Sequence, residues 1–249
     1  MSKSAELVGL VHGISLADSA KRRDAIKNLA NASGALANFA AELAATDCVA
    51  RETVLVIEKP SAVVTAAAQT NSIEVFNHFP TASDLIAVAA GDQLSNIEFV
   101  FARMLTNKDF VQLLGFIATD DESWKGEIET LRNLFQRVLA SDLTGLIDEF
   151  STEPILELAK QIATAISRKT PVIIDGTRAL LAAAIVYEFS VAARSWIFVS
   201  DLPKSSAGQL LLKHRNWITV SGNQVATGDG LAAIASLSLA RTAALLIRP

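Results

Sequence analysis

The stretch Pro171-Val172-Ile173-Ile174-Asp175-Gly176 decides the fold of this 249-residue chain. Three consecutive β-branched residues between a proline and an Asp-Gly pair are typical of a buried strand that ends in a turn. Helical apolar patterns stand on both sides of it, from Glu153 to Lys169 and from Ala179 to Phe189. A buried strand between two helices is the repeating unit of α/β folds.

The same alternation continues toward the C-terminus. We expect strands over Trp196–Val199 and Trp217–Val220, and helices over Ser205–Lys213 and Leu231–Leu246. Strands joined by helices form right-handed crossovers and a parallel sheet, and strands this apolar are covered on both faces. The sequence therefore predicts an α/β fold with a parallel, Rossmann-like sheet and helices on both faces.

Toward the N-terminus, the pattern predicts three further strands. They fall on Thr53–Ile57, Ile73–Phe76 and, more centrally, Leu113–Ala118. Ser61 can cap a short helix between the first two strands, and an acidic start at Asp120 opens a helix after the third. These elements extend the sheet.

A long helix over Asp18–Ala45 fits the alternation poorly. We expect it to pack with part of the C-terminal helix as a small helical lobe. The predicted organisation is a helical segment over residues 1–50 and an α/β domain over residues 51–249.

The composition excludes several classes of protein. The chain is 51% hydrophobic, but its apolar runs, such as Ala179–Tyr187, are shorter than the roughly 20 residues that cross a bilayer. The first residues show no signal peptide, so we expect a cytoplasmic protein. Cys48 is the sole cysteine and the three histidines lack ligand spacing, so we expect no metal site and no cofactor.

Charge is unevenly distributed along the chain. From Lys160 onward there are ten Lys and Arg against four Asp and Glu, whereas the first 159 residues hold twelve against twenty-two. This asymmetry indicates either an anionic ligand or subunit partner, or a solvated surface without a function. The basic residues are dispersed and aromatic residues make up 6% of the chain, which argues against a nucleic-acid partner.

Ligands of open α/β sheets bind beyond the carboxyl ends of the strands. Three loops follow strands here, beginning at Asp175, at Ser200 and at Ser221. Their carboxylates, hydroxyls and glycine turns suit a phosphorylated sugar, with free N–H groups near Ser205, Ser206 and Gly208 available to an anion. Simpler roles stay open, since Asp175 or the serine pair could cap a helix, and Gly228-Asp229-Gly230 is a common turn and cap.

The strand that ends in Asp175-Gly176, the Ala-rich helix and the Gly228-Asp229-Gly230 turn resemble the C-terminal part of the nicotinate-nucleotide:dimethylbenzimidazole phosphoribosyltransferase family. In that family the turn reads Gly-Glu-Gly, and its glutamate is the catalytic base. The resemblance implies a transferase that binds a nucleotide and an aromatic base, with Asp229, one methylene shorter than glutamate, as the catalytic residue. The candidate substrate-binding residues are Asp175, Gly176, Glu153, Ser205, Ser206, Gly208, Gly228 and Gly230.

Other family motifs are degraded in this chain. Of the early Lys-Pro-Pro-Gly-Ser-Leu-Gly motif only Gly34 and Leu36 fit, and the segment 119–122 puts acidic residues where the family has a glycine-rich loop. The Gly-Gly-Phe-Glu segment keeps at most Glu153, and the His-x-Ser-x-Glu-Pro-Gly loop becomes the unrelated segment 201–207.

These departures leave an alternative open: a catalytically inactive relative that binds a ligand or pairs with a related subunit. The active enzyme would pair with itself or with such a relative. A dinucleotide oxidoreductase is disfavoured, because no GxGxxG follows a candidate strand.

Overall fold

The computed structural model of the protein describes residues 3–16, 20, 24, 27, 40, 54–57, 62–70, 75–76, 143–150, 153–203, 209, 212–213, 215–217, 219–221 and 228–247. Of the predicted helix over Asp18–Ala45 it describes four residues, each helical. The predicted strand at Leu113–Ala118, the acidic helix after it, and Ser205, Ser206 and Gly208 lie outside the described residues.

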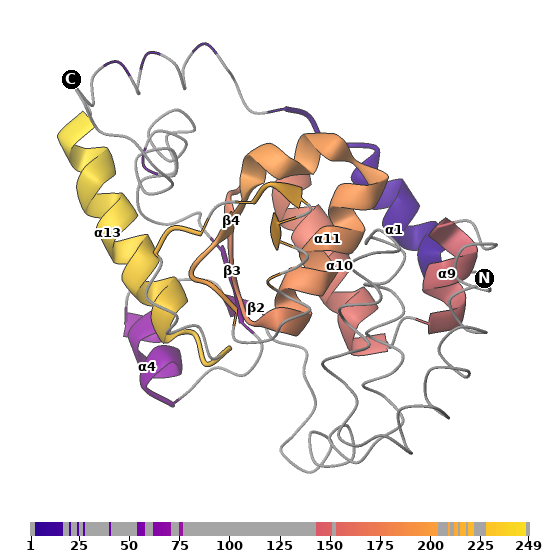
Figure 1. Ribbon diagram of the computed structural model, residues 1–249, viewed down its shortest axis with the longest axis horizontal. Helices are drawn as coiled ribbons and strands as arrows, with labels where there is room; N and C mark the ends of the chain where they lie inside the picture. The colour runs from indigo at the N-terminus through magenta and orange to yellow at the C-terminus, as the bar shows by residue number, and fades with distance from the viewer. Residues whose placement is uncertain are drawn as a thin grey trace, which may run out of the picture.

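Among the residues that the structure describes, four parallel strands form the sheet, in the order β2-β1-β3-β4 (Figure 1). They span Val54–Ile57 (β1), Val75–Phe76 (β2), Val172–Asp175 (β3) and Ile197–Val199 (β4). The parallel sheet predicted from the sequence is confirmed. β3 lies between β1 and β4 and is fully buried, as a continuous β-branched run requires.

The predicted strand at Trp217–Val220 is reduced to a single parallel bridge between Thr219 and Val199. Backbone hydrogen bonds continue along this edge, from Val220 N to the Val199 carbonyl (2.8 Å) and from Ser221 N to the Ser200 carbonyl (2.9 Å). The chain at Val220 and Ser221 therefore follows β4 past its end, at the carboxyl edge of the sheet.

Helices cover both faces of the sheet (Figure 1). One face carries α13 (Leu231–Ile247) and α4 (Ala62–Thr70), which contact each other. The other carries α10 (Glu153–Ser167) and α11 (Thr177–Phe189), backed by α1 (Lys3–Val11) and α9 (Leu143–Phe150). The predicted α/β architecture is therefore confirmed.

The core lies mainly between β3, α11 and α10. Every residue from Ala179 to Val186 in α11 is fully buried, because this helix is apolar on all sides and is enclosed by the sheet and by α10. The predicted apolar face of α10 is confirmed as well, with Ile155, Leu158, Ile162 and Ile166 all buried.

Two helices and a 3₁₀ segment (η1, Val191–Trp196) lie where the sequence pattern predicted none. Contacts between distant parts of the chain stabilise α1: Leu7 is buried in the core, and Ser4 N donates to Asp148 Oδ1 of α9 (2.8 Å). The Trp196 indole N–H donates to the Ser15 carbonyl (2.8 Å), which fixes the chain after α1.

The predicted helical lobe involves two parts of the chain. α13 packs against β1 and β3, so this helix covers the sheet. Its proposed partner falls mostly outside the described residues, and the division at residue 50 stays a prediction.

Candidate functional site

Two strand ends and one helix start meet at the carboxyl edge of the sheet. Asp175 is the last residue of β3, and Ser200 directly follows β4, with its N–H bonded to the Ile174 carbonyl (2.9 Å). Ser236, one turn into α13, donates from Oγ to the Ser200 carbonyl (3.2 Å). These contacts hold the first turns of α13 against the ends of β3 and β4.

The Gly228-Asp229-Gly230 turn opens α13. Gly228 has φ 77° and Gly230 has φ 90°, conformations that side chains disfavour, so both positions require glycine. The turn directs Asp229 Oδ1 to the backbone N–H of Leu231 (3.0 Å). Asp229 therefore caps α13, and the cap that the sequence left open as a simple role is confirmed.

Asp175 lies beneath this turn and is fully buried. Neither of its carboxyl oxygens makes a hydrogen bond to the described part of the chain. The pKa of this carboxyl is raised from its ordinary 3.8 to about 6, mainly by burial and to a smaller extent by the nearby Asp229. The backbone N–H groups of Ala233, Gly228 and Gly230 act in the opposite direction and lower the pKa.

The structure brings together four of the predicted site residues: Asp175, Asp229, Gly228 and Gly230. Gly176, with φ 108°, follows Asp175 and is the N-cap residue of α11. The alternative in which Asp175 caps the next helix is therefore wrong, because Gly176 occupies that position and Asp175 faces the start of α13.

The structure gives less information on the other predicted site residues. Glu153 is the first residue of α10. The three candidates in the loop after β4 lie outside the described residues. Binding roles for all of these residues stay predictions.

Two buried polar residues at this edge, Ser200 and Asp201, belong to a loop that the sequence already placed here, and Asp201 Oδ1 accepts from Leu202 N (2.7 Å). Sequence reasoning missed the buried Ser236. It belongs to the small-residue face of α13, with Ala232, Ala233 and Ala240, that packs on the sheet.

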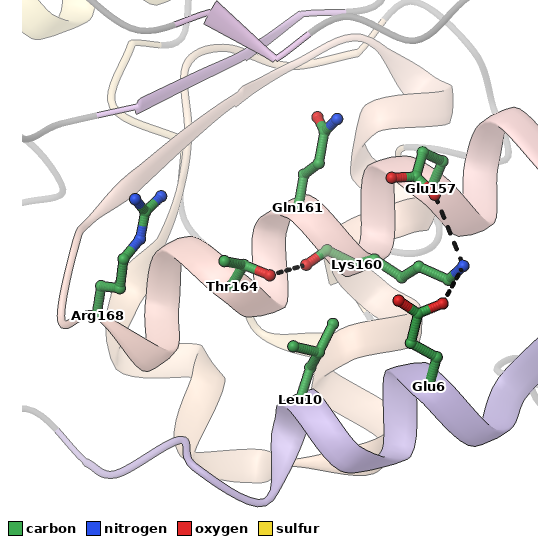
Figure 2. Close-up of a pocket in the computed structure, with 7 residues that line it drawn as sticks. All are labelled: Glu6, Leu10, Glu157, Lys160, Gln161, Thr164 and Arg168. Atoms are coloured by element: carbon green, nitrogen blue, oxygen red, sulfur yellow. Dashed lines mark hydrogen bonds and ion pairs between the residues drawn. The ribbon is translucent and has the colours of Figure 1, made fainter.

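A cavity of about 350 Å³ lies elsewhere, between α1 and α10 (Figure 2). Lys160 Nζ crosses it, 2.8 Å from Glu6 Oε2 and 3.6 Å from Glu157 Oε2. The positive charge of Lys160 is balanced by these two carboxylates. The Lys160–Glu6 ion pair therefore links α10 to α1 and has a structural role. None of the predicted site residues lines it; its residues are Glu6, Leu10, Glu157, Lys160, Gln161, Thr164 and Arg168.

Two further findings concern only the described ranges. They contain no group of three His, Cys, Asp or Glu side chains that could hold a metal ion. None of their helices combines the length and the apolar character that crossing a membrane requires.

Comparison with known proteins identifies the family of this chain. The phosphoribosyltransferase family model matches residues 98–249, more than half of the chain. The nicotinate-nucleotide–dimethylbenzimidazole phosphoribosyltransferase of Corynebacterium efficiens is 29% identical over 126 residues, which are 50% of this chain and 34% of that protein. The protein of the same name from Corynebacterium glutamicum strain R is 30% identical over 95 residues, 37% of this chain and 26% of the relative. The matches thus span 34% and 26% of these relatives' length.

Solved structures show the same fold. A nicotinate-nucleotide–dimethylbenzimidazole phosphoribosyltransferase from Thermus thermophilus superposes with a TM-score of 0.60 at 15% identity, covering 92% of this chain and 96% of the other. A second structure, CobT from the same organism, gives 0.57. At this identity the likeness concerns the fold alone, but the family match is independent of it, and the resemblance predicted from the motifs is confirmed: this chain belongs to the phosphoribosyltransferase family.

Proposed function

We propose that this protein transfers phosphoribose from nicotinate mononucleotide to an aromatic base such as dimethylbenzimidazole, in the assembly of a cobamide lower ligand. The names of its sequence relatives support the substrates, and the family match supports the reaction type. A cytoplasmic location and pairing with a second copy or a related subunit belong to the same proposal.

The proposed chemistry is one displacement at the ribose. A ring nitrogen of the aromatic base attacks the anomeric carbon of nicotinate mononucleotide, and a new carbon–nitrogen bond forms. The bond to nicotinate breaks, and nicotinate leaves with its electron pair. The proton on the attacking ring system passes to the Asp229 carboxylate, which acts as general base.

The position of Asp229 is the observation that carries the proposal. Its carboxylate is partly exposed at the carboxyl edge of the parallel sheet, where ligands of open α/β sheets bind. It also directly precedes the first turn of a 17-residue helix, whose N-terminal end favours a negatively charged side chain. A carboxylate in this position suits a general base.

Asp175, Gly176, Gly228 and Gly230 complete the proposed site around Asp229. In this proposal the glycines let the substrate approach the backbone closely, and Asp175 acts from beneath the turn. Glu153 and the hydroxyls of Ser205 and Ser206, with Gly208, are proposed to contact the nucleotide. Their support is the family motif and the loop chemistry, since a phosphate suits free N–H groups at a helix start.

The first test is calorimetry and turnover on the purified protein. We expect nicotinate mononucleotide to bind at micromolar to millimolar Kd. We expect Asp229→Asn to retain that binding but to lose about 100-fold or more in kcat, because the general base is gone. Asp229→Glu restores the family's longer side chain and should preserve or increase turnover.

Asp24→Asn is a matched control, since this side chain is 74% exposed and pairs only with Lys27 among its described contacts. It should behave as the wild type. Absence of binding heat from both the nucleotide and dimethylbenzimidazole, or full activity of Asp229→Asn, contradicts the proposal.

One observation favours the second candidate function, an inactive relative that acts as a ligand-binding or interaction subunit. On the outer side of α13, Leu231 and Leu239 are 51% and 54% exposed, and Val63 of the neighbouring α4 is 69% exposed. Large exposed apolar side chains on two helices that contact each other are a feature of subunit contacts. The interaction role is the better account if two results are found together. Leu239→Glu prevents association with a second copy or a related subunit, and neither Asp229→Asn nor Asp229→Glu changes turnover.

A further inference from the structure

Basic residues collect at the amino edge of the sheet, which is opposite the edge that carries the proposed site. Three stretches of chain lead into neighbouring strand positions there: residues 168–171 precede β3, residues 190–196 precede β4, and residues 213–216 precede the segment that bridges to β4. None of the three stretches contains an Asp or Glu. Their Lys and Arg residues are Arg168, Lys169, Arg194, Lys213 and Arg215.

The strand register aligns these stretches side by side. Val172 of β3 pairs with Ile197 of β4, and Lys169 and Arg194 each stand three residues before their member of that pair. A parallel bridge from Thr219 to the end of β4 aligns the third stretch in the same way. Neighbouring strands are about 4.8 Å apart, so the three stretches enter the sheet within about 10 Å of one another.

A hydrogen bond between two of the stretches holds Arg194 in place. Its Nη2 donates to the Asn216 carbonyl (3.1 Å), and the 3₁₀ segment η1 that contains it also contacts α10 and α11. A guanidinium group has five N–H donors, and this bond uses one nitrogen. The Arg194 side chain is therefore positioned and can still bind an anion.

One carboxylate at this edge is already engaged. Glu188, in the last turn of α11, forms an ion pair with Arg215. The same guanidinium lies 5.3 Å from the centre of the Tyr187 ring. Arg215 and Glu188 thus neutralise each other, and the other basic residues of the three stretches give this edge an excess of positive charge.

Three of those residues, Arg168, Arg194 and Lys213, are exposed, and none of them forms an ion pair with a described residue. Figure 2 shows Arg168 at the end of α10, apart from the carboxylates of Glu6 and Glu157. The whole chain has a net charge of −4, so this edge is positive on a protein that is negative overall. A surface of one sign attracts a partner of the opposite sign.

We infer that the amino edge of the sheet is a docking surface for an acidic segment of another protein, whose carboxylates pair with Arg168, Arg194 and Lys213. Three extended residues span about 10 Å, and guanidinium groups bind carboxylates through paired N–H donors. A nucleic acid fits this edge less well, because its aromatic rings pack on each other. Trp217 is 8% exposed and lies edge-on to Tyr187, 5.8 Å between ring centres, so these rings make a poor stacking surface for bases.

The probe that tests this surface is a labelled ten-residue polyglutamate peptide, followed by fluorescence anisotropy at low salt. Because the net charge of the protein repels this peptide, binding requires a local basic surface. We expect Arg194→Glu and Lys213→Glu each to weaken Kd by about tenfold, and the double variant by about 100-fold. Lys27→Glu is the matched control, since it makes the same charge change at a side chain that is 75% exposed elsewhere. It should change Kd by less than about twofold.

Two results with polyglutamate overturn the inference: no binding by the wild type, or an equal loss in Lys27→Glu, which would indicate a diffuse effect of net charge. A ten-nucleotide oligothymidylate is the second probe. If it binds more tightly than polyglutamate and loses binding in the same variants, the surface binds nucleic acid and the inference is wrong.

The inference does not depend on the proposed transferase chemistry, which lies at the carboxyl edge. We expect Arg194→Glu and Lys213→Glu to bind nicotinate mononucleotide as the wild type does. If the wild type binds no nucleotide, the proposed function fails, and the peptide measurements still test the amino edge.

Discussion

At the end of β3, one side chain makes the stability of the whole protein depend on pH. The pKa of Asp175 is raised from 3.8 to about 6 by burial, so the folded protein holds this proton more tightly than the unfolded chain does. Its stabilising effect is complete below about pH 4 and is lost as the pH rises through about 6.

We therefore predict that the free energy of unfolding falls between pH 4 and pH 7, by about 3 kcal/mol at most from this group. Asp175→Asn should remove that decrease, because asparagine carries no charge to bury. Urea unfolding followed by tryptophan fluorescence at several pH values measures it. Asp24→Asn should retain the wild-type dependence. Parallel curves for the wild type and Asp175→Asn would show that Asp175 is not responsible.

The glycines give a second prediction at the residue scale. Gly230 has φ 90°, so Gly230→Ala should destabilise the fold by about 1 to 2 kcal/mol. Gly9 lies inside α1 with open space where an alanine methyl group would project, so Gly9→Ala should stabilise the fold by about 0.5 to 1 kcal/mol. Opposite changes in melting temperature are the expected result, and two changes of the same sign would contradict it.

At the scale of elements, α10 shows how one helix can be predicted while its end is not. The basic residues Arg168 and Lys169 suit the negative end of the helix dipole. The structure adds a specific turn, in which Lys169 has φ 61°, Lys169 N bonds to Ile166 O (2.8 Å) and Thr170 N bonds to Ala165 O (3.0 Å). This closing turn satisfies the last carbonyls and leads the chain into β3.

The apolar face of α10 supplies the prediction for this scale. Ile162 is fully buried in the core, so Ile162→Ala should lower the free energy of unfolding by about 2 to 5 kcal/mol through lost burial and a cavity. Leu16→Ala removes the same number of carbon atoms from a side chain that is 72% exposed. It should cost about 0.5 kcal/mol or less by the same chemical unfolding measurement. Equal costs at both positions would contradict the assignment of the core.

At the scale of the whole molecule, the sheet gathers residues that are far apart in the chain. Asp175 and Asp229 are separated by fifty-four positions, yet one carboxyl raises the pKa of the other. Parallel strands put their carboxyl ends at one edge, and α13 begins at that edge. Gly228-Asp229-Gly230 is a common turn sequence and indicates little by itself. It becomes part of a candidate site because the parallel sheet brings it next to the end of β3.

The sequence by itself determined the parallel α/β fold, because fully buried strands must be almost wholly apolar and β-branched, and such runs are visible in β1 and β3. It also determined the family, through short motifs at the ends of those elements. Only the tertiary structure decided that α1 is a helix, that Asp229 caps α13, and that Asp175 faces α13 rather than α11. Those outcomes depend on burial and on hydrogen bonds between segments that are far apart in the sequence. Local sequence patterns do not predict which of these distant groups come into contact.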